Sequence, residues 1–178
     1  FTARLSQVEL ESRSVMASPA ELEGIKVLVV DDNETNRLIC TELLSGLGAS
    51  VNEVENGEQA IQVIRNADSK GNPYHLILLD LKMPGIDGFM VAELINGMPL
   101  TCLPQMVMLT ANDGFEEKAR ARELNISSYI VKPYRRAELL EGILIALGKK
   151  EKKLSHDLPA PEMERRRVLI LWYMYSLH

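Results

Sequence analysis

The chain has 178 residues, 46% of them hydrophobic and 25% charged, and a formal net charge of −5. This length suits one domain of about 100–150 residues with extensions, and the composition is ordinary for a soluble globular protein. The longest apolar run, Val168–Tyr175, is far shorter than the ~20 residues that a membrane helix needs. We therefore expect no membrane contact by this segment.

The first 23 residues predict a linker, because serines, Pro19 and four glutamates interrupt every apolar period. From Gly24 onward, strand-type and helix-type patterns alternate. Strands are expected at 25–30, 50–54, 75–80, 105–109 and 128–131. Helices are expected at 34–47, 57–67, 88–96, 114–124 and 135–147. The domain predicted from these elements spans residues 24–149, and residues 150–178 form a linker or tail.

The helix at 34–47 has an apolar stripe made of Leu38, Ile39, Leu43, Leu44 and Leu47. Most of these side chains are expected to face the core, with part of a docking surface as the alternative for Leu38, Ile39 and their neighbours. Two strands, 75–80 and 105–109, are apolar almost throughout, as strands covered on both faces should be. The strand at 50–54 mixes polar and apolar residues, which fits an edge position.

Five successive strand–helix repeats predict an α/β fold, with a doubly wound parallel sheet covered by helices on both faces. In such a sheet the carboxyl ends of all strands lie on one edge, where ligands bind. Four of the expected strands run into polar residues at that edge: Asp31-Asp32, Asp80, Thr110 and Lys132-Pro133. Three carboxylates, a hydroxyl and an ammonium group in one cleft would suit a divalent cation together with a phosphoryl group.

Each of these residues also has a purely structural interpretation. Asp31 and Asp32 fit an N-cap pair for the following helix, because aspartate is a good cap. Lys132 fits a solvated surface lysine, although Pro133 after it argues for a rigid turn that directs the side chain inward. Thr110 fits a strand-forming residue, and Tyr129 fits an amphipathic ring at the start of a strand.

The charge distribution bears on partners. Residues 24–148 carry 11 lysines and arginines against 17 acidic residues, whereas residues 149–167 carry 7 against 4. An acidic domain argues against direct binding to nucleic acid, and the tail, with Pro159 and Pro161, has no helix-turn-helix pattern.

Cys40 and Cys102 show no metal-type spacing and are expected to be reduced cytosolic thiols. No signal peptide is expected, and the absence of an initial methionine suggests a piece of a longer protein.

Residues 24–149 closely resemble the receiver domain of two-component response regulators. The resemblance rests on five segments in order, at 27–33, 56–60, 79–88, 109–111 and 131–133, which read VLVVDDN, NGEQA, LDLKMPGIDG, LTA and VKP. It implies a flavodoxin-like (βα)5 fold with strand order 2-1-3-4-5, in agreement with the edge position of residues 50–54.

The resemblance implies a role for each residue of the cleft. Asp80 would be the phosphoacceptor, and Mg²⁺ would be bound by Asp32, Asp80 and the main-chain carbonyl of Lys82, with Asp31 acting through water. Thr110 and Lys132 would contact the phosphoryl group, and the Lys132–Pro133 peptide bond would be cis. Lys82 and Asn112 would tune dephosphorylation. Tyr129 would be the switch residue that responds at the surface of the fourth helix and fifth strand.

The resemblance also implies partners and context. The partner would be a histidine kinase or a histidine phosphotransfer domain. Asp80 would take the phosphoryl group from a phosphohistidine, and the receiver would then relay it to a histidine phosphotransfer domain or signal by a change of shape. A weak homodimer is left open. Phe1–Leu5 resembles the last strand of a kinase ATP-binding domain, which favours a hybrid histidine kinase as parent, cytoplasmic here and membrane-anchored elsewhere. Residues 167–170 resemble the start of a second receiver, but Leu171–Met174 then departs from that pattern.

Two other function classes remain as alternatives. The first is an interaction or regulatory module that keeps the fold and is rarely phosphorylated, against which the complete set of site residues argues. The second is a phosphoaspartate phosphatase acting on external substrates. Such an enzyme would need an acidic residue two positions after Asp80, where Lys82 stands. Whether the chain is itself an enzyme stays open, because a receiver catalyses only its own phosphorylation and dephosphorylation.

Overall fold

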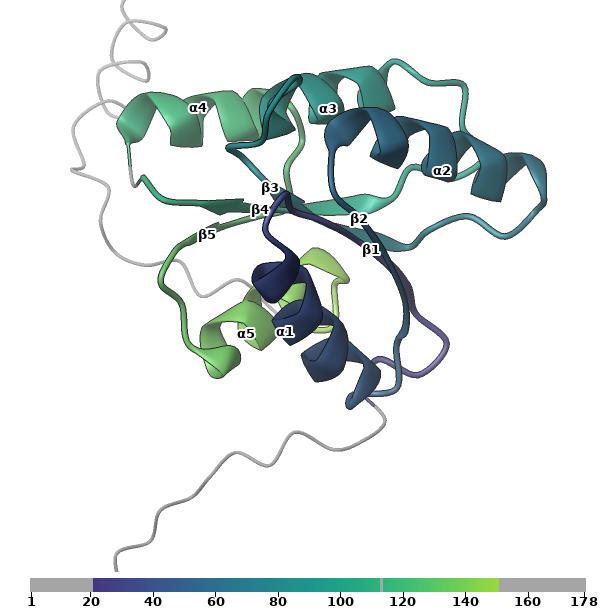
Figure 1. Ribbon diagram of the computed structural model, residues 1–178, viewed down its shortest axis with the longest axis horizontal. Coiled ribbons are helices and arrows are strands. Elements are labelled where there is room, and N and C mark those ends of the chain that lie inside the picture. Colours follow the sequence, from purple (N-terminus) through teal and green to yellow (C-terminus); the bar gives the residue numbers. More distant parts are fainter. Residues whose placement is uncertain (1–20, 113, 151–178) are drawn as a thin grey trace, which may run out of the picture.

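Five parallel strands form one sheet between two layers of helices in the computed structural model, which describes residues 21–112 and 114–150 (Figure 1). The strands are β1 (Lys26–Val30), β2 (Ser50–Val54), β3 (Leu76–Asp80), β4 (Gln105–Thr110) and β5 (Ser128–Val131). The helices are α1 (Glu34–Ser45), α2 (Gly57–Ser69), α3 (Gly88–Asn96), α4 (Phe115–Glu123) and α5 (Arg136–Ala146). All ten predicted elements are confirmed, with bounds that differ by two residues or fewer.

The strand order is β2-β1-β3-β4-β5, and every neighbouring pair is parallel. This is the flavodoxin-like α/β order expected from the sequence. The β2 strand lies at the edge and is exposed or half-buried along its length, whereas every residue of β3 is buried. The polar and apolar mixture in β2 and the apolar run of β3 therefore report the position of each strand in the sheet.

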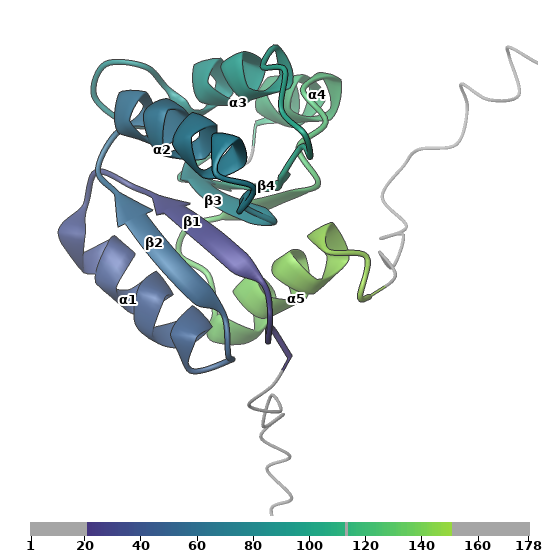
Figure 2. The ribbon, with the colours of Figure 1, turned by 90° about the vertical axis from the view of Figure 1, so that its right-hand side faces the viewer.

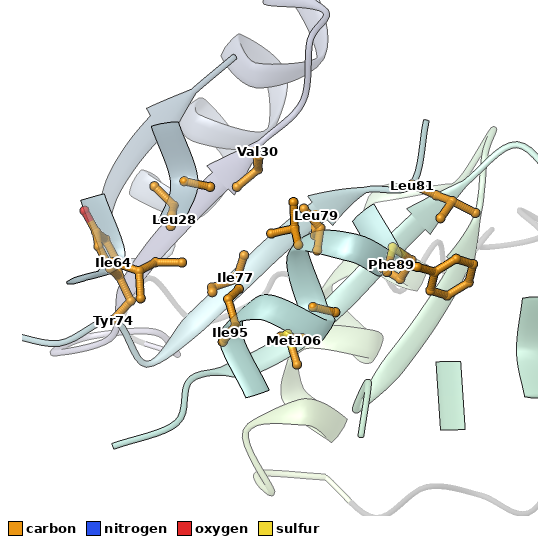
Figure 3. Packing of buried hydrophobic residues seen from close by; sticks show 14 of the residues in the cluster. Leu28, Val30, Ile64, Tyr74, Ile77, Leu79, Leu81, Phe89, Ile95 and Met106 are labelled. Atoms are coloured by element: carbon orange, nitrogen blue, oxygen red, sulfur yellow. The ribbon is translucent and has the colours of Figure 1, made fainter. Parts of the chain in front are cut away.

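Alternation along the strands divides the core into two clusters. Leu28, Ile77 and Met106 point to the face covered by α2, α3 and α4 (Figure 3). Val29 and Leu78 point to the opposite face, which α1 and α5 cover (Figure 2). Successive strand residues point to opposite faces of a sheet, so both layers of helices bury apolar side chains against the same five strands.

The α1 helix buries only part of its apolar stripe. Cys40 and Leu44 are buried, but Leu38 and Ile39 are each 55% exposed. Leu47 is buried too and Leu43 is half-buried, so most of the stripe faces the core as expected, and Leu38 and Ile39 are the exceptions. They lie on the side of α1 turned away from the sheet, because positions one or two residues before Cys40 are about 100–200° from it around a 3.6-residue helix.

The packed region begins slightly before the expected boundary at residue 24. Leu22 is fully buried in the cluster beneath α1 and α5, and its main-chain N–H donates to the carbonyl of Leu47 at 3.0 Å. The remaining features expected in residues 1–20 and 151–178 lie outside the described residues. Within the described part, no helix has the length and apolar character needed to cross a bilayer.

Candidate functional site

The carboxyl ends of β1 and β3 bring three aspartates together. Asp31 and Asp32 follow β1, and Asp80 is the last residue of β3, which pairs with β1 up to Val30 and Leu79. Asp31 and Asp80 are buried, with exposures of 2% and 7%, while Asp32 is exposed. One carboxylate oxygen from each residue lies within 4.8 Å of the other two. The predicted acidic cluster therefore forms, with one side open to solvent.

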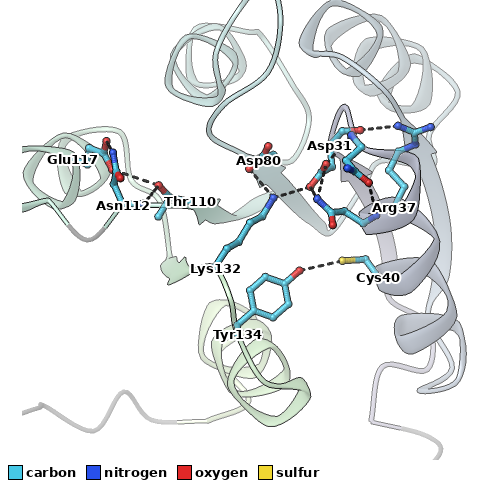
Figure 4. A network of polar contacts seen from close by, with 11 residues as sticks. Asp31, Arg37, Cys40, Asp80, Thr110, Asn112, Glu117, Lys132 and Tyr134 are labelled. Carbon is cyan, nitrogen blue, oxygen red and sulfur yellow. Dashed lines mark hydrogen bonds and ion pairs between the residues drawn. The ribbon is translucent and has the colours of Figure 1, made fainter.

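Lys132, just after β5, joins two of these aspartates (Figure 4). Its Nζ donates to Oδ2 of Asp31 and to Oδ1 of Asp80, each at 2.9 Å. Burial of the ammonium group acts to lower the pKa of Lys132, but the hydrogen bonds and charges of the two carboxylates outweigh it and raise that pKa. The lysine is therefore firmly protonated and is not a solvated surface residue.

At Asp80 the effect of burial on the pKa outweighs the effect of the oppositely charged partner. Burial raises the pKa of its carboxyl group above the ordinary value of 3.8, and the negative charges of Asp31 and Asp32 add to this effect. The hydrogen bond and positive charge of Lys132 counteract it without cancelling it. The site therefore disfavours the negative charge of Asp80, and a more basic carboxylate is a better nucleophile.

The start of α1 holds Asp31 in place. Oδ1 of Asp31 accepts hydrogen bonds from the main-chain N–H of Asn33 at 2.9 Å and from Nδ2 of Asn36 at 3.1 Å. Arg37 donates to the main-chain carbonyls of Asp31 and Asp32 at 2.9 and 3.1 Å. Asn33 is the N-cap of α1, so the interpretation of the two aspartates as helix caps is wrong. Both aspartates belong to the acidic cluster instead.

The donor set fits a magnesium ion. Mg²⁺ prefers oxygen ligands at about 2.1 Å, so opposite ligands of an octahedral ion are about 4.2 Å apart. The carboxylate oxygens of Asp31, Asp32 and Asp80 span at most 4.8 Å, and a small contraction would match that value. Mg²⁺ keeps several waters when few protein ligands are available, and the exposed position of Asp32 leaves room for them.

The loop after Asp80 is built on close backbone packing. Gly85 has a positive φ of +83°, which a residue without a side chain adopts freely. At Gly88, the first residue of α3, a Cβ atom would lie 2.6 Å from the carbonyl oxygen of Asp80. Lys82 is exposed on this loop and lines an open groove between it and α4. The loop therefore approaches Asp80 closely and leaves Lys82 at the rim of the acidic cluster.

Thr110 and Tyr129 form a second polar cluster beside the first, as the left side of Figure 4 shows for Thr110. The Thr110 hydroxyl accepts from the main-chain N–H of Asn112 at 3.1 Å and lies 3.4 Å from Oε2 of Glu117 on α4. The hydroxyl of Tyr129 lies 2.6 Å from the same Glu117 oxygen and 3.0 Å from the carbonyl of Asn112. The backbone links this cluster to Lys132, whose N–H donates to the Thr110 carbonyl at 2.6 Å.

The structure thus brings Asp31, Asp32, Asp80 and Lys132 into direct reach of one another, but it turns the Thr110 hydroxyl toward α4. The peptide bond between Lys132 and Pro133 is cis, as the resemblance implied. Sequence reasoning assigned no role to Asn36, Arg37 or Glu117. A charged segment such as 116–123 is typical of a solvated helix face, so nothing in its pattern points to Glu117.

Comparison with known proteins agrees with this geometry. The profile of the response regulator receiver domain matches residues 27–144. The chain is 37% identical over 128 residues to hybrid signal transduction histidine kinase L of Dictyostelium discoideum, covering 70% of this chain and 7% of that protein. It is 33% identical over 121 residues to protein PilG of Pseudomonas aeruginosa, covering 68% of this chain and 86% of that protein.

Solved structures give the same result for the fold. A response regulator described as putative, from Chloroflexus aurantiacus, has a TM-score of 0.62 and 29% identity, covering 70% of this chain and 98% of that one. Chemotaxis protein CheY4 of Vibrio cholerae has a TM-score of 0.63 at 24% identity, covering 69% and 98%.

The curated relatives differ greatly in length, and the chain spans 7% and 16% of two of them, hybrid kinase L and the gliding motility regulatory protein of Myxococcus xanthus. With the family profile covering residues 27–144 and the strand order and acidic cluster in place, this chain belongs to the response regulator receiver domain family of two-component signalling.

Proposed function

We propose that Asp80 accepts a phosphoryl group from a phosphohistidine in a Mg²⁺-dependent reaction. The observation that carries this proposal is the pair of 2.9 Å contacts through which Lys132 joins Asp80 to Asp31, inside a cluster of carboxylates spanning at most 4.8 Å. Asp32, Asp80 and the main-chain carbonyl of Lys82 would hold the ion directly, with Asp31 acting through water. The ion supplies positive charge that neutralises the phosphoryl oxygens.

In the proposed step, a carboxylate oxygen of Asp80 forms a bond to phosphorus. The bond from phosphorus to the donor's imidazole nitrogen breaks, and its electron pair leaves with that nitrogen, which takes a proton from solvent. The product is an acyl phosphate on Asp80.

The other residues of the site position the phosphoryl group. Lys132 has one ammonium group that already contacts Asp80, so it is placed to donate to a phosphoryl oxygen. Thr110 would donate its hydroxyl to the same group once it is present. Lys82 and Asn112, at the rim of the cleft, would control the entry of the water that removes the phosphoryl group. Tyr129 would then change its environment and carry the signal to the surface of α4 and β5.

The exposed side of α1 fits the surface that meets the phosphoryl donor. Leu38 and Ile39 are exposed beside the acidic cluster, and Ile39 lines an open groove with Lys132, Pro133 and Tyr134. Exposed apolar side chains at the rim of a site mark an interaction surface. The donor would be a histidine kinase or a histidine phosphotransfer domain, and the phosphoryl group would pass onward or change the surface of α4 and β5.

The proposal extends to the parent protein. We infer a hybrid histidine kinase in which residues 1–23 follow an ATP-binding domain and residues 150–178 lead onward, with the receiver in the cytoplasm and the anchor elsewhere. The relative hybrid kinase L, by its name, is a protein of this kind. The sequence of the full parent gene tests this inference, and a DNA-binding domain after residue 178 would contradict it.

Labelling by a small phosphodonor tests the central proposal. The chain is incubated with acetyl phosphate and Mg²⁺, and the mass increase of one phosphoryl group is measured. We expect full loss of labelling in Asp80→Asn and after chelation of Mg²⁺. Asp68→Asn is the matched control, because Asp68 lies near the end of α2 and contacts Thr101. Labelling that persists in Asp80→Asn would refute the site, and Mg²⁺ binding without labelling would favour an interaction module.

A further inference from the structure

Glu117, on the first turn of α4, is the acceptor for three residues of the second cluster. Its Oε2 atom lies 2.6 Å from the Tyr129 hydroxyl and 3.4 Å from the Thr110 hydroxyl. Its Oε1 atom accepts from Nδ2 of Asn112 at 3.4 Å. The carboxylate therefore contacts two residues that sequence similarity assigns to phosphoryl binding and switching, and one assigned to dephosphorylation.

The Thr110 hydroxyl can donate a hydrogen bond to only one acceptor at a time. A threonine hydroxyl has one proton to donate. The Thr110 oxygen already accepts from the N–H of Asn112, and Glu117, as a carboxylate, can only accept. In this arrangement Glu117 is the acceptor in reach of the single Thr110 proton, at 3.4 Å, and a group on Asp80 would have to compete for that proton.

The hydrogen bond from Tyr129 to Glu117 is stronger than the one from Thr110 to Glu117. A hydroxyl–carboxylate distance of 2.6 Å is typical of a charge-assisted hydrogen bond. The Tyr129 hydrogen bond is the main cause of a lowered pKa at Glu117. Burial, the second-largest effect, acts to raise that pKa, and the contacts with Asn112 and Thr110 and the charge of Lys82 act to lower it. Glu117 is therefore an anion that remains ionised in the unphosphorylated protein.

We propose that Glu117 is a positioning residue that holds Thr110 and Tyr129 in the unphosphorylated arrangement and competes with the phosphoryl group for the Thr110 proton. This proposal rests on the proposed phosphorylation of Asp80. Both anions need the same donor, so Thr110 must leave Glu117 before it binds the phosphoryl group. That exchange breaks the contact between Glu117 on α4 and Thr110 at the end of β4, and it gives the first turn of α4, which includes the exposed Phe115, a direct response to phosphorylation.

Beryllofluoride, which mimics a phosphoryl group on a carboxylate, measures this competition. The full chain is titrated with it in saturating Mg²⁺, and tyrosine ring signals are followed by NMR. In Glu117→Ala we expect half-saturation at about threefold to tenfold less beryllofluoride, because the long 3.4 Å contact with Thr110, a hydrogen bond of ordinary net strength, is lost from the unliganded state. Glu117→Gln, which keeps an acceptor without the charge, should lie between Glu117→Ala and the unsubstituted chain.

Glu116→Ala is the matched control. Glu116 is the neighbouring exposed glutamate on the same turn and has no hydrogen bond to Thr110 or Tyr129 among the described contacts. It should change half-saturation by less than about twofold, because a distant exposed charge contributes little. Equal effects of Glu116→Ala and Glu117→Ala, or a higher half-saturation in Glu117→Ala, would overturn the proposal.

Two further measurements separate the possible failures. In a Thr110→Val background the gain from Glu117→Ala should fall below about twofold, since no hydroxyl remains to be competed for. A full gain in that background would overturn the proposal. Without beryllofluoride, Glu117→Ala should shift the Tyr129 ring signal, and no shift would also overturn it. If the unsubstituted chain binds no beryllofluoride although Tyr129 shifts, the proposed phosphorylation fails while the resting contact stands.

Discussion

Asp80 combines burial, two like-charged neighbours and a single ammonium partner, and its raised pKa means that folding makes its charge costly. Asp80→Asn removes the charge and keeps the shape. We therefore expect it to raise the free energy of unfolding in magnesium-free buffer at pH 7, by about 1 kcal/mol, a typical gain on relaxing a functional site. Urea unfolding in the presence of a chelator measures the change, and a loss of stability would show that the ion pair with Lys132 dominates.

The pH dependence of this difference has a definite sign. A carboxyl group with a raised pKa in the folded state holds its proton more tightly there, so stability falls as pH rises from 3.8 to the raised value. The advantage of Asp80→Asn should therefore be complete above that interval and shrink as the pH approaches 3.8. Unfolding curves from pH 7 downward test this prediction, with Asp68→Asn as the control. An advantage that grew with acidity would contradict it.

At the scale of elements, the close contact between α3 and the end of β3 fixes the backbone around Asp80. A Cβ at Gly88 would meet the Asp80 carbonyl at 2.6 Å and the Cα of Leu81 at 3.0 Å, both backbone atoms. Backbone atoms cannot rotate away from the new methyl group as a flexible side chain could. Gly88→Ala should therefore destabilise the fold by about 1–3 kcal/mol and reduce acetyl phosphate labelling. Gly97→Ala is the control, since its nearest contact would be 3.6 Å. Equal melting temperatures for the two variants would contradict this prediction.

The exposed side of α1 leads to a separate prediction. Leu38→Ala and Ile39→Ala should change stability by less than about 0.5 kcal/mol, as expected for exposed positions. Leu44→Ala, fully buried on the same helix, should cost about 2–5 kcal/mol. We expect the first two variants to slow phosphotransfer from a phosphohistidine protein and to leave labelling by acetyl phosphate unchanged. Equal slowing with both donors would place their effect in the chemistry and not in docking.

For the whole molecule, binding of Mg²⁺ to the folded chain should raise the free energy of unfolding. An ion that binds only the folded state at tenfold above its Kd adds about 1.4 kcal/mol to the free energy of unfolding. We expect the melting temperature of the unsubstituted chain and of Asp68→Asn to rise with Mg²⁺, and that of Asp32→Asn to rise much less. Sodium chloride of equal ionic strength is the control. An equal response in Asp32→Asn would remove that residue from the ion's ligands.

Much of the fold could be predicted because local patterns and global topology agree. The apolar run in β3 and the mixed run in β2 distinguish a central strand from an edge strand, since burial on two faces selects different residues from burial on one. Strand ends at Asp31, Asp80 and Lys132 then placed the site, because parallel strands share one carboxyl edge. Exposure along α1 was harder to predict, because Leu38 and Ile39 have the same apolar character as Leu44.

The sequence by itself determined the repeat of strand and helix, the acidic edge and the lysine that serves it, because these follow from residue type and chain order. Only the tertiary structure decided which side chains form hydrogen bonds with one another in the site. Asn36 donates a hydrogen bond to Asp31, and Glu117 accepts hydrogen bonds from the hydroxyls of Thr110 and Tyr129. Those contacts join residues on different elements at distances of about 3 Å, and hydrogen bonds depend on such distances too steeply for a pattern of residue types to specify them.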